Sequence, residues 1–551
     1  MAQLDGVAKK IVRVMWWLLA ALPIAAACYW ASFAARMPEA LANRISLGEV
    51  TPRWEIEEWT NVVSEPMHVL ARLLHLTALQ IPGATIASVV WVNVVLALVL
   101  VVLLVDVLRR AFPTTGSAGP LAFLVFGLLV ASPSFGTNWL HGQRVGIFAV
   151  PVLFVLALTW LQTNKTARIV MAFVLAGLAP WFHVHGAIVA IALIPATLCA
   201  TTAVASQRRM VWIGVLLLLG VVGAILTMQP NGGLAAVGAD RLGSLTSDPK
   251  ATVLALMTAT GNLWLDLLPG TDVDAQAFGI VSWLMPVALL RLGNRSPEAR
   301  AAAAPWWSCW LFGLLIVVVN AIRYDLDPAA GTLREAMFGA FLLPIGLLGV
   351  LAARFGPGVL TLAAGAIAVL AVQDWRDGIE DFRIAHLRAE QVEALTIVPE
   401  SVSAGAALPT RTAEQFATLV KNGWVPGATP VKVDDVFAQF EEYAAPGLGV
   451  LSGGRSDLVT GSLRTSLRAP GVQWIALVGR VADEPLRILG YMWPRYVSKN
   501  RDVQWQIAPS PALVDGVHIR AVGLLVRERK LVTLGQEFIM FDGALVSANG
   551  G

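Results

Sequence analysis

Acidic side chains gather in one polar stretch between the first two apolar runs of the chain. Of the glutamates within residues 36–83, four lie near two tryptophans: Glu49, Glu55, Glu57 and Glu58, with Trp54 and Trp59 among them, and Glu65 follows. A carboxylate close to a bilayer is partly desolvated, which favours its protonated form and suits it to general-base chemistry. The alternative is a solvated acidic face with an interfacial belt of tryptophans. The four glutamates are candidate catalytic residues.

Arginines and histidines occupy other short polar segments between apolar runs. They are His141 and Arg144 in one segment, His183 and His185 in a second, and Arg323 and Arg334 in a third. Arginine offers a bidentate fork, and histidine both donates and accepts, so such side chains at helix ends bind phosphate well. The alternative is that the arginines only anchor helix ends to lipid headgroups. All six are candidate ligands for a phosphate that lies in the headgroup layer of the membrane.

The sequence gives only weak evidence for a metal site. Acidic or imidazole side chains stand one residue apart at Glu55 and Glu57, at Asp325 and Asp327, and at His183 and His185. Oxygen-rich pairs suit Mg²⁺ or Mn²⁺, but pairs of this kind are common by chance. The sequence predicts no metal site and leaves a divalent cation as an open cofactor.

The composition is that of a membrane protein. Of 551 residues, 56% are hydrophobic and 14% charged, whereas about a quarter of a soluble protein is charged. The net charge of +3 gives no basis for a nucleic-acid partner. The three cysteines, Cys28, Cys199 and Cys309, lie in apolar runs, so no disulfide framework is expected in the exported parts.

The apolar runs predict about eleven transmembrane helices, since each crossing takes about 20 apolar residues. The expected spans are 11–35, 84–108, 118–133, 145–162, 168–182, 186–204, 210–228, 277–291, 305–322, 336–353 and 357–373. The first is interpreted as a retained helix and not as a cleaved signal peptide. The pair that meets at residues 181–185 is also compatible with a single hairpin that dips into the membrane.

Basic residues predict the orientation of these spans. The segments assigned to the cytoplasm hold Lys9, Lys10, Arg13, Arg109, Arg110, Lys165, Arg168, Arg208, Arg209, Arg291, Arg295, Arg300 and Arg354. The short segments assigned to the outside hold Arg144, Arg323 and Arg334. This positive-inside bias places the N-terminus in the cytoplasm and the C-terminus in the periplasm or outside the cell, across a bacterial inner membrane.

The predicted organisation is a transmembrane domain, 1–373, with outer loops 36–83 and 229–276, followed by an exported soluble α+β domain, 374–551. Residues 65–79 have the periodicity of an interfacial amphipathic helix, and 250–268 could form an interfacial or re-entrant helix. In the soluble domain, helices are expected near 411–421 and 433–443, and strands of an antiparallel sheet at 472–480, 486–493, 503–507, 518–527, 531–534 and 537–541. Trp474, Trp493 and Trp505 either stack on sugars from an exposed face or belong to the core of this sheet.

The layout resembles the GT-C superfamily of glycosyltransferases over nearly the whole chain. The acidic outer loop after the first helix, with Glu49 through Glu58, is one point of likeness, and it leads to Glu65-Pro66-Met67-His68-Val69-Leu70, which stands where that superfamily often has an HPPL-like segment. A second long outer loop after the seventh helix and a soluble outer domain after the last helix are two more. That superfamily usually carries an Asp-Asp, Asp-Glu or Glu-Asp signature in its first loop. This chain has no aspartate there, so the base stays open among the four glutamates.

The resemblance implies transfer of a hexosyl or pentosyl group from a polyprenyl-phosphate donor to a glycan, lipid or protein, within a membrane lipid environment. A loop carboxylate would act as general base, and arginine and histidine would hold the phosphate. Two other classes of protein stay open: a surface-polysaccharide polymerase or ligase, and a non-enzymatic lipid or glycan transporter. Polar residues within the spans are few, among them Asn93, Ser308 and Asn320, which counts against a transport path.

Overall fold

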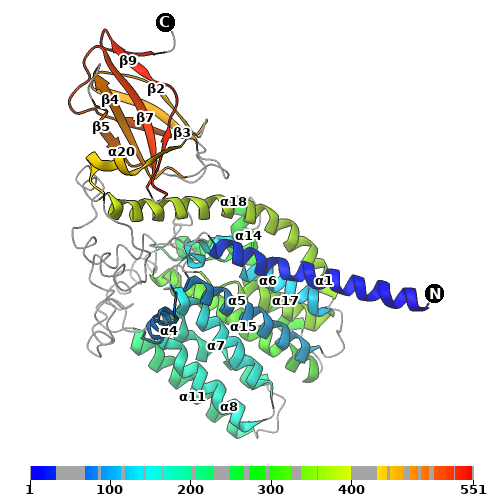
Figure 1. The fold of residues 1–551 in the computed structure, drawn as a ribbon. Coiled ribbons are helices and arrows are strands. Elements are labelled where there is room, and N and C mark those ends of the chain that lie inside the picture. The colour runs from blue at the N-terminus through cyan, green and yellow to red at the C-terminus, as the bar shows by residue number, and fades with distance from the viewer. Residues whose placement is uncertain are drawn as a thin grey trace. The chain divides into compact units, whose positions relative to one another are not determined.

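The structure is a computed structural model of the chain (Figure 1). It describes residues 2–32, 69–84, 88–112, 118–140, 144–163, 165–199, 206–227, 248–265, 272–292, 297–323, 337–356, 358–398, 431–443, 447–464, 471–481, 485–494, 502–526 and 528–548. The described residues fall into two compact units, a helical unit that runs to Ile379 and a unit from Glu380 onward that contains a β-sheet.

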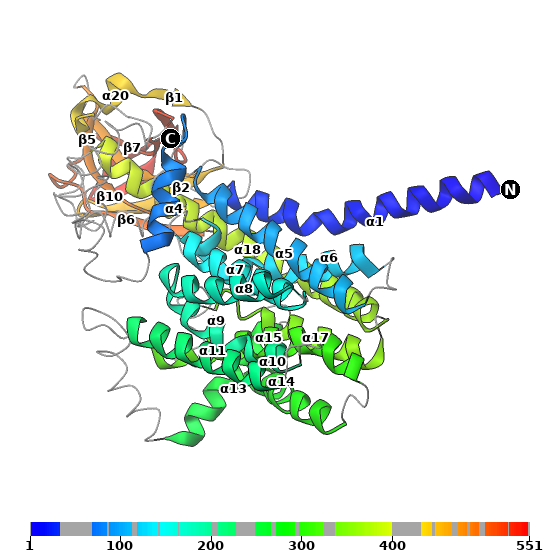
Figure 2. The same ribbon diagram turned by 90° about the horizontal axis from the view of Figure 1, so that it is seen from below.

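The helical unit consists of apolar helices, and the last of them, α18, continues past Ile379 into the second unit. They are α1 (Ala2–Ala31), α4 (Val69–Leu79), α5 (Val90–Ala111), α6 (Ala118–Val130), α7 (Val145–Leu161), α8 (Thr166–Leu178), α9 (Val189–Ala192), α10 (Ile194–Cys199), α11 (Ser206–Thr227), α13 (Pro249–Leu265), α14 (Asp272–Leu292), α15 (Pro297–Arg323), α17 (Leu342–Phe355) and α18 (Gly358–Ile397). Figure 2 shows α5, α7 and α8 side by side. The chain is therefore mostly helical up to its sheet-containing part.

Within the described ranges, three helices are long and apolar enough to cross a membrane: Val14–Ser32, Val90–Ala111 and Ala299–Asn320. Shorter apolar helices cover most of the other expected spans. Backbone groups in hydrocarbon must be satisfied within their own helix, which accounts for this all-helical arrangement. The count of about eleven spans stays a prediction.

The region expected to form a single span over 186–204 is divided into short helices. The 3₁₀ helix η5 (Val184–Ile188) leads into α9, and α10 begins at Ile194, with Pro195 in its first turn. Proline has no N–H to continue a preceding helix, so the helical hydrogen-bonding pattern is interrupted there. The last predicted span also differs, because α18 is 40 residues long and continues past residue 373.

The helix considered at 250–268 is present as α13 and lies against α14. A Cβ at Gly261 would stand 1.7 Å from the carbonyl oxygen of Ala275, so the two helix backbones are in close contact. Trp264 Nε1 donates a hydrogen bond of 2.8 Å to Ser282 Oγ on α14. Small residues at the crossing and a hydrogen bond across it are typical of helix pairs within membranes.

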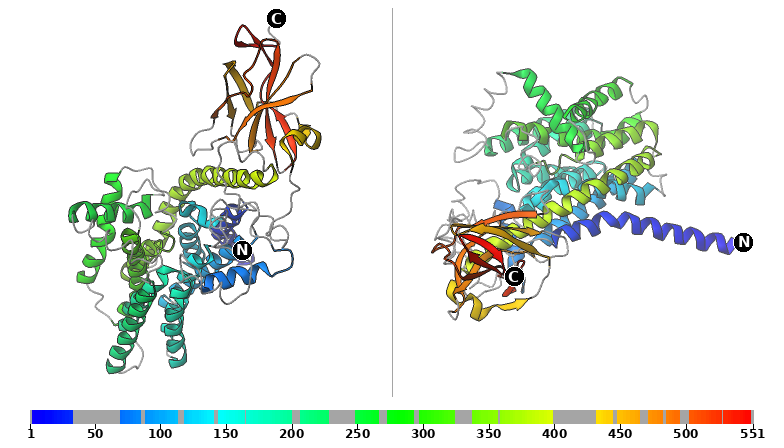
Figure 3. Two further views of the ribbon diagram at one scale, coloured as in Figure 1. Left: turned by 90° about the vertical axis from the view of Figure 1, so that its left-hand side faces the viewer. Right: turned by 90° about the horizontal axis from the view of Figure 1, so that it is seen from above.

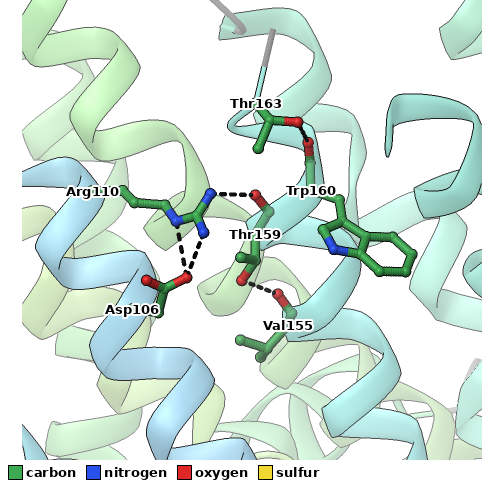
Figure 4. A network of polar contacts seen from close by, with 6 residues as sticks. All are labelled: Asp106, Arg110, Val155, Thr159, Trp160 and Thr163. Carbon is green, nitrogen blue, oxygen red and sulfur yellow. Dashed lines mark hydrogen bonds and ion pairs between the residues drawn. The ribbon is translucent and has the colours of Figure 1, made fainter. Parts of the chain in front are cut away.

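Polar side chains tie α5 to α7 at the end predicted to face the cytoplasm (Figure 4). Arg110 Nε donates to Asp106 Oδ2 at 2.9 Å, one turn earlier on α5, and Arg110 Nη1 donates to the carbonyl oxygen of Thr159 at 3.3 Å. Thr163 Oγ1 donates to the carbonyl oxygen of Trp160 just beyond. A guanidinium near the last carbonyls of a helix is favoured by the helix dipole. The carboxyl ends of α5 and α7 therefore meet at one end of the helical unit.

The second unit contains ten strands within the described residues. They are β1 (Glu441–Tyr443), β2 (Gly449–Arg455), β3 (Leu458–Arg464), β4 (Trp474–Val481), β5 (Arg487–Met492), β6 (Asp502–Ile507), β7 (Val517–Leu525), β8 (Lys530–Thr533), β9 (Phe538–Phe541) and β10 (Ala544–Ser547). Their order is β1-β8-β7-β9-β10-β2-β3-β6, and β4 pairs with both β5 and β7. Figure 3 shows these strands in yellow-orange to red. All of these pairs are antiparallel except β1–β8.

The six expected strands are confirmed as β4 to β9, and the strands β1, β2, β3 and β10 were not expected. The helix expected near 433–443 is shorter than expected. It consists of the 3₁₀ helix η7 (Val433–Asp435) and α20 (Val436–Gln439), after which the chain enters β1. The helix expected at 411–421 lies outside the described residues.

Strands β4, β7 and β8 are buried on both faces. Alternate residues of β4 point to opposite sides, so Ile475 and Leu477 enter a core shared with β2, β3, β6 and β9, whereas Trp474 and Ala476 enter a second core. The second core is closed by the end of α18 and by residues 431–440. The final turns of α18 are thus part of this unit's interior.

Trp474 and Trp505 of this unit are core residues. Trp474 is 0% exposed and Trp505 is 1% exposed. Trp493 stacks on Trp474 with ring centroids 6.1 Å apart. For Trp474 and Trp505 the expectation of an exposed sugar-stacking face is wrong, and the core alternative is confirmed. Their apolar area stabilises the sheet more than it would stabilise a binding face.

The buried carboxylate of Glu390 on α18 is hydrogen-bonded to Gln473, which precedes β4 in the same unit. Glu390, 8% exposed, has one oxygen 3.1 Å from His386 Nε2, and its other oxygen accepts a hydrogen bond of 3.1 Å from Gln473 Nε2. Gln473 Oε1 in turn accepts from the backbone N–H of Val526, directly after β7. A buried carboxylate is tolerated when it is paired and hydrogen-bonded in this way.

Candidate functional site

Of the candidate ligands, the structure describes Arg144, His183 and His185, and it gives Arg323 as the last residue of α15. Glu49, Glu55, Glu57, Glu58, His141 and Arg334 lie outside the described residues. Arg144 is half-buried and immediately precedes the first turn of α7. Its side chain therefore belongs to the amino end of that helix, where anions are favoured by the helix dipole.

The two histidines stand in a turn between α8 and α9, which is called the histidine turn below and comprises residues 179–188. It is made of η4 (Ala179–Trp181) and η5. Pro180 suits the first turn of η4, since its ring fixes φ near the helical value. His183 is extended, with φ −164° and ψ 156°, and caps η5. Both rings are buried, at 7% and 3% exposure.

A hydrogen bond inside the turn sets the tautomer of His183. The backbone N–H of His185 donates to His183 Nδ1 at 3.3 Å. A ring nitrogen that accepts a hydrogen bond carries no proton, so the neutral His183 ring has its proton on Nε2. The two imidazoles meet edge to face with centroids 4.5 Å apart. His183 is therefore held as an Nε2–H donor, the form that suits an anionic oxygen.

His185 connects the histidine turn to α15. Its Nε2 lies 3.1 Å from Oδ1 of Asn320, which is fully buried in the last turn of α15. Asn320 Nδ2 also donates to Met337 Sδ at 3.9 Å. Met337 begins a tight turn, 337–341, that leads into α17. Three segments distant in sequence thus meet through one asparagine side chain.

The turn at 337–341 requires glycine at its centre. Gly339 has φ +96°, a backbone conformation that other residues adopt only with strain. A Cβ there would also lie 2.8 Å from Ile316 Cδ1 on α15. The aromatic ring of Phe338 packs on Phe148 at 4.2 Å and on Trp139 at 6.2 Å between ring centroids. This turn therefore joins α15 to the start of α7 and to the segment before it.

That segment is the 3₁₀ helix η2 (Pro133–Trp139), held by buried amides. Asn93 Nδ2, near the start of α5, donates to the carbonyl oxygen of Asn138 at 3.3 Å. Asn138 Nδ2 donates to the carbonyl oxygen of Phe135 at 2.9 Å, and Asn93 and Asn138 are both fully buried. Hydrogen bonds donated by these buried amide groups hold the local geometry. The chain that leads to Arg144 is thereby held on α5.

The helix α4 lies directly against this region. A Cβ at Gly146, near the start of α7, would stand 2.2 Å from the carbonyl oxygen of Phe182 and 3.0 Å from Ala71 Cβ of α4. Gly146 follows Arg144 by two residues, and Phe182 precedes His183. His75 is one helical turn after Ala71 and has a buried Nδ1. Of the amphipathic helix expected over 65–79, the structure describes a helix over 69–79, which contacts both α7 and the histidine turn, and its interfacial position stays a prediction.

The structure thus brings His183 and His185 together, and it places α4 and the amino end of α7, which Arg144 precedes, against the turn that holds them. It adds Asn320, which the sequence did not single out as a site residue. Asn320 had a visible signal, a lone amide within a run of apolar residues. In the described part of the chain, no group of three or more histidine, cysteine, aspartate or glutamate side chains is placed to hold a metal ion.

Comparisons with known proteins give one loose likeness. No family model and no curated protein matches the sequence. Among solved structures, the arabinosyltransferase EmbB from Mycobacterium smegmatis is similar with a TM-score of 0.32 and 11% identity, over 92% of this chain. The chain spans 64% of the length of that protein. A likeness of this size identifies neither a family nor a residue role for this chain.

Proposed function

We propose that this chain is an integral membrane glycosyltransferase of the GT-C type. It transfers a hexosyl or pentosyl group from a polyprenyl-phosphate donor to a hydroxyl of a glycan, lipid or protein. The reaction takes place on the outer side of the inner membrane, and the acidic loop before α4 supplies the base.

The observation that supports the proposal is the close contact between the amino end of α7, next to Arg144, and the histidine turn that holds His183. Arg144 and His183 flank the contact between Gly146 and Phe182, and α4 covers that contact. The chain that carries the four candidate glutamates leads directly into α4. An arginine at a helix amino end and an Nε2–H imidazole are donors suited to a phosphate. This set of groups supports chemistry at a phosphate-bearing lipid.

The proposed reaction is a single displacement at the anomeric carbon. One glutamate among Glu49, Glu55, Glu57 and Glu58 takes the proton of the acceptor hydroxyl, and the acceptor oxygen forms a bond to the anomeric carbon. The bond from that carbon to the phosphate oxygen breaks, and polyprenyl phosphate leaves with the electron pair. Arg144 and His183 stabilise the charge that develops on the leaving oxygen, which is the largest catalytic contribution expected of the protein.

Sugar transfer in proteoliposomes tests the proposal. The purified chain is supplied with a radiolabelled polyprenyl-phosphate hexose or pentose and with a glycan acceptor. We expect label in the acceptor together with release of polyprenyl phosphate. Movement of labelled donor between leaflets with no transfer would contradict the proposal and favour the transporter class. Joining of preformed lipid-linked glycan chains would favour the polymerase or ligase class.

A glutamine series identifies the base. Replacing Glu49, Glu55, Glu57 and Glu58 singly with glutamine is expected to lower kcat by about 10²-fold at one position, because glutamine cannot accept the acceptor proton. The matched control is Asp457→Asn, an exposed carboxylate in the sheet-containing unit, which should leave the rate unchanged. Full activity in all four variants would exclude the acidic loop as the source of the base.

A further inference from the structure

A lone buried amide stands in the last turn of α15. Asn320 follows the apolar run from Leu314 to Val319 and is 0% exposed. Burying an amide away from water is costly unless its polar atoms are hydrogen-bonded. An apolar residue of similar volume would satisfy the packing of the helix without that requirement. The buried asparagine therefore indicates that hydrogen bonds of its side chain matter at this position.

The partners of Asn320 fix the orientation of its amide. A thioether sulfur has no proton to donate and only accepts, so the NH₂ group of Asn320 faces Met337 Sδ. The amide oxygen then faces His185 Nε2 at 3.1 Å. An amide oxygen can only accept, so the proton of a neutral His185 ring resides on Nε2 and not on Nδ1. Asn320 thus selects one tautomer of a buried histidine.

His185 is also the residue whose backbone N–H bonds His183 Nδ1. The position of the His185 ring and the tautomer of His183 are therefore linked through two hydrogen bonds in series. A change at α15 that frees the His185 ring also frees the backbone that holds His183. Outer partners of a functional histidine commonly act in this way, by fixing its ring orientation and its tautomer.

We propose that Asn320 is a positioning residue for the histidine turn, whose amide oxygen holds His185 as the Nε2–H tautomer and so keeps His183 oriented for phosphate binding. The role of His183 in this statement rests on the proposed function. The linkage between Asn320 and the two histidines does not, and it can be measured without any turnover.

Asparagine and glutamine variants of His185 test whether the Asn320–His185 hydrogen bond affects sugar transfer. The side-chain NH₂ of glutamine falls near the place of histidine Nε2, and that of asparagine falls near Nδ1, so H185Q keeps a donor for Asn320 and H185N does not. N320L and H185N are expected to lower kcat/KM by about 10- to 100-fold. H185Q should stay within about 3-fold of the wild type. The double variant N320L/H185N should be no worse than either single change, because the two act as one unit.

Chemical modification of histidines measures the link between Asn320 and His183 without any need for enzymatic activity. Diethyl pyrocarbonate acylates accessible unprotonated imidazole, and mass spectrometry of the full chain in detergent reports each histidine separately. N320L is expected to raise the modification rate of His183 several-fold, because the turn that buries it opens more often. His518, 37% exposed in the other unit, serves as the internal control and should be modified at an unchanged rate.

The outcomes separate the two ideas. If wild-type protein transfers no sugar but N320L still exposes His183, the proposed function fails and the positioning role stands. If the wild type is active, and N320L leaves both kcat/KM and the modification of His183 unchanged, the positioning role fails. Equal loss in H185Q and H185N, in proportion to a fall in folded protein, would assign His185 and Asn320 to packing alone and overturn the inference.

Discussion

Leucine at position 349 is expected to abolish accumulation of the folded protein in the membrane. Gly349 lies on α17, where a Cβ would stand 2.1 Å from Cδ2 of the Trp306 ring on α15. Trp306 is fully buried and also packs on Phe126 of α6, so the indole has no room to move away. One turn earlier, a Cβ at Gly346 would lie 2.4 Å from a backbone nitrogen of α15. The two helices depend on these close approaches, which a side chain forbids.

The measurement is size-exclusion chromatography of detergent-solubilised protein that carries a fluorescent reporter. G349L should give aggregate or no signal at the elution volume of the wild type. The matched control is G365L on α18, where a Cβ meets nothing within 4 Å. It should elute as the wild type does. A monodisperse G349L peak at wild-type yield would show that the contact between α15 and α17 is looser than described.

Alanine at position 505 is expected to destabilise the sheet-containing unit by about 3–5 kcal/mol. Trp505 is 1% exposed on β6, and its ring covers Gly461, the residue opposite it on β3. A Cβ at Gly461 would lie 2.1 Å from Trp505 Cζ2, so the indole occupies the space that a side chain on β3 would fill. The loss is a large part of the roughly 5–15 kcal/mol that stabilises a typical domain.

Pulse proteolysis of the full chain in increasing urea measures this loss as a lower midpoint for cleavage within residues 447–548. The control is F541A, which removes a large aromatic ring that is 70% exposed and should shift the free energy of unfolding by no more than about 0.5 kcal/mol. If W505A and F541A behaved alike, Trp505 would have to lie at the surface, and the possibility of sugar stacking would return.

Periodicity in the sequence predicts the elements whose apolar residues follow a regular pattern. Strands β4 to β9 are rich in Val, Ile, Leu and Trp, and all six were expected. Strands β2 and β3 were missed because their sequences, Gly449–Arg455 and Leu458–Arg464, contain glycine, serine, threonine and arginine at many positions. They are strands because their alternate residues enter a core that other strands complete, which no local pattern reveals.

The site could be predicted only in part, for a related reason. Arg and His at helix ends are visible as residue types, so His183, His185 and Arg144 were found. Asn320 was noted only as a rare polar residue within a span, because its role depends on a contact with a histidine 135 positions away in the chain. Likewise, burial distinguishes a core tryptophan such as Trp474 from a binding tryptophan, and burial is a property of the folded chain.

The pairing of β10 with β2 has a consequence for how the protein is made. Ala544 of β10 aligns with Arg455 of β2, and Ser547, at the end of β10, aligns with Phe538 of β9. The ribosome must therefore have passed residue 544 before the two halves of the sheet can be joined. Until then, β2 and β9 present unpaired edges that can recruit other chains. Nascent molecules of this protein should depend on holding chaperones during that interval, and premature termination before residue 544 should direct them to degradation.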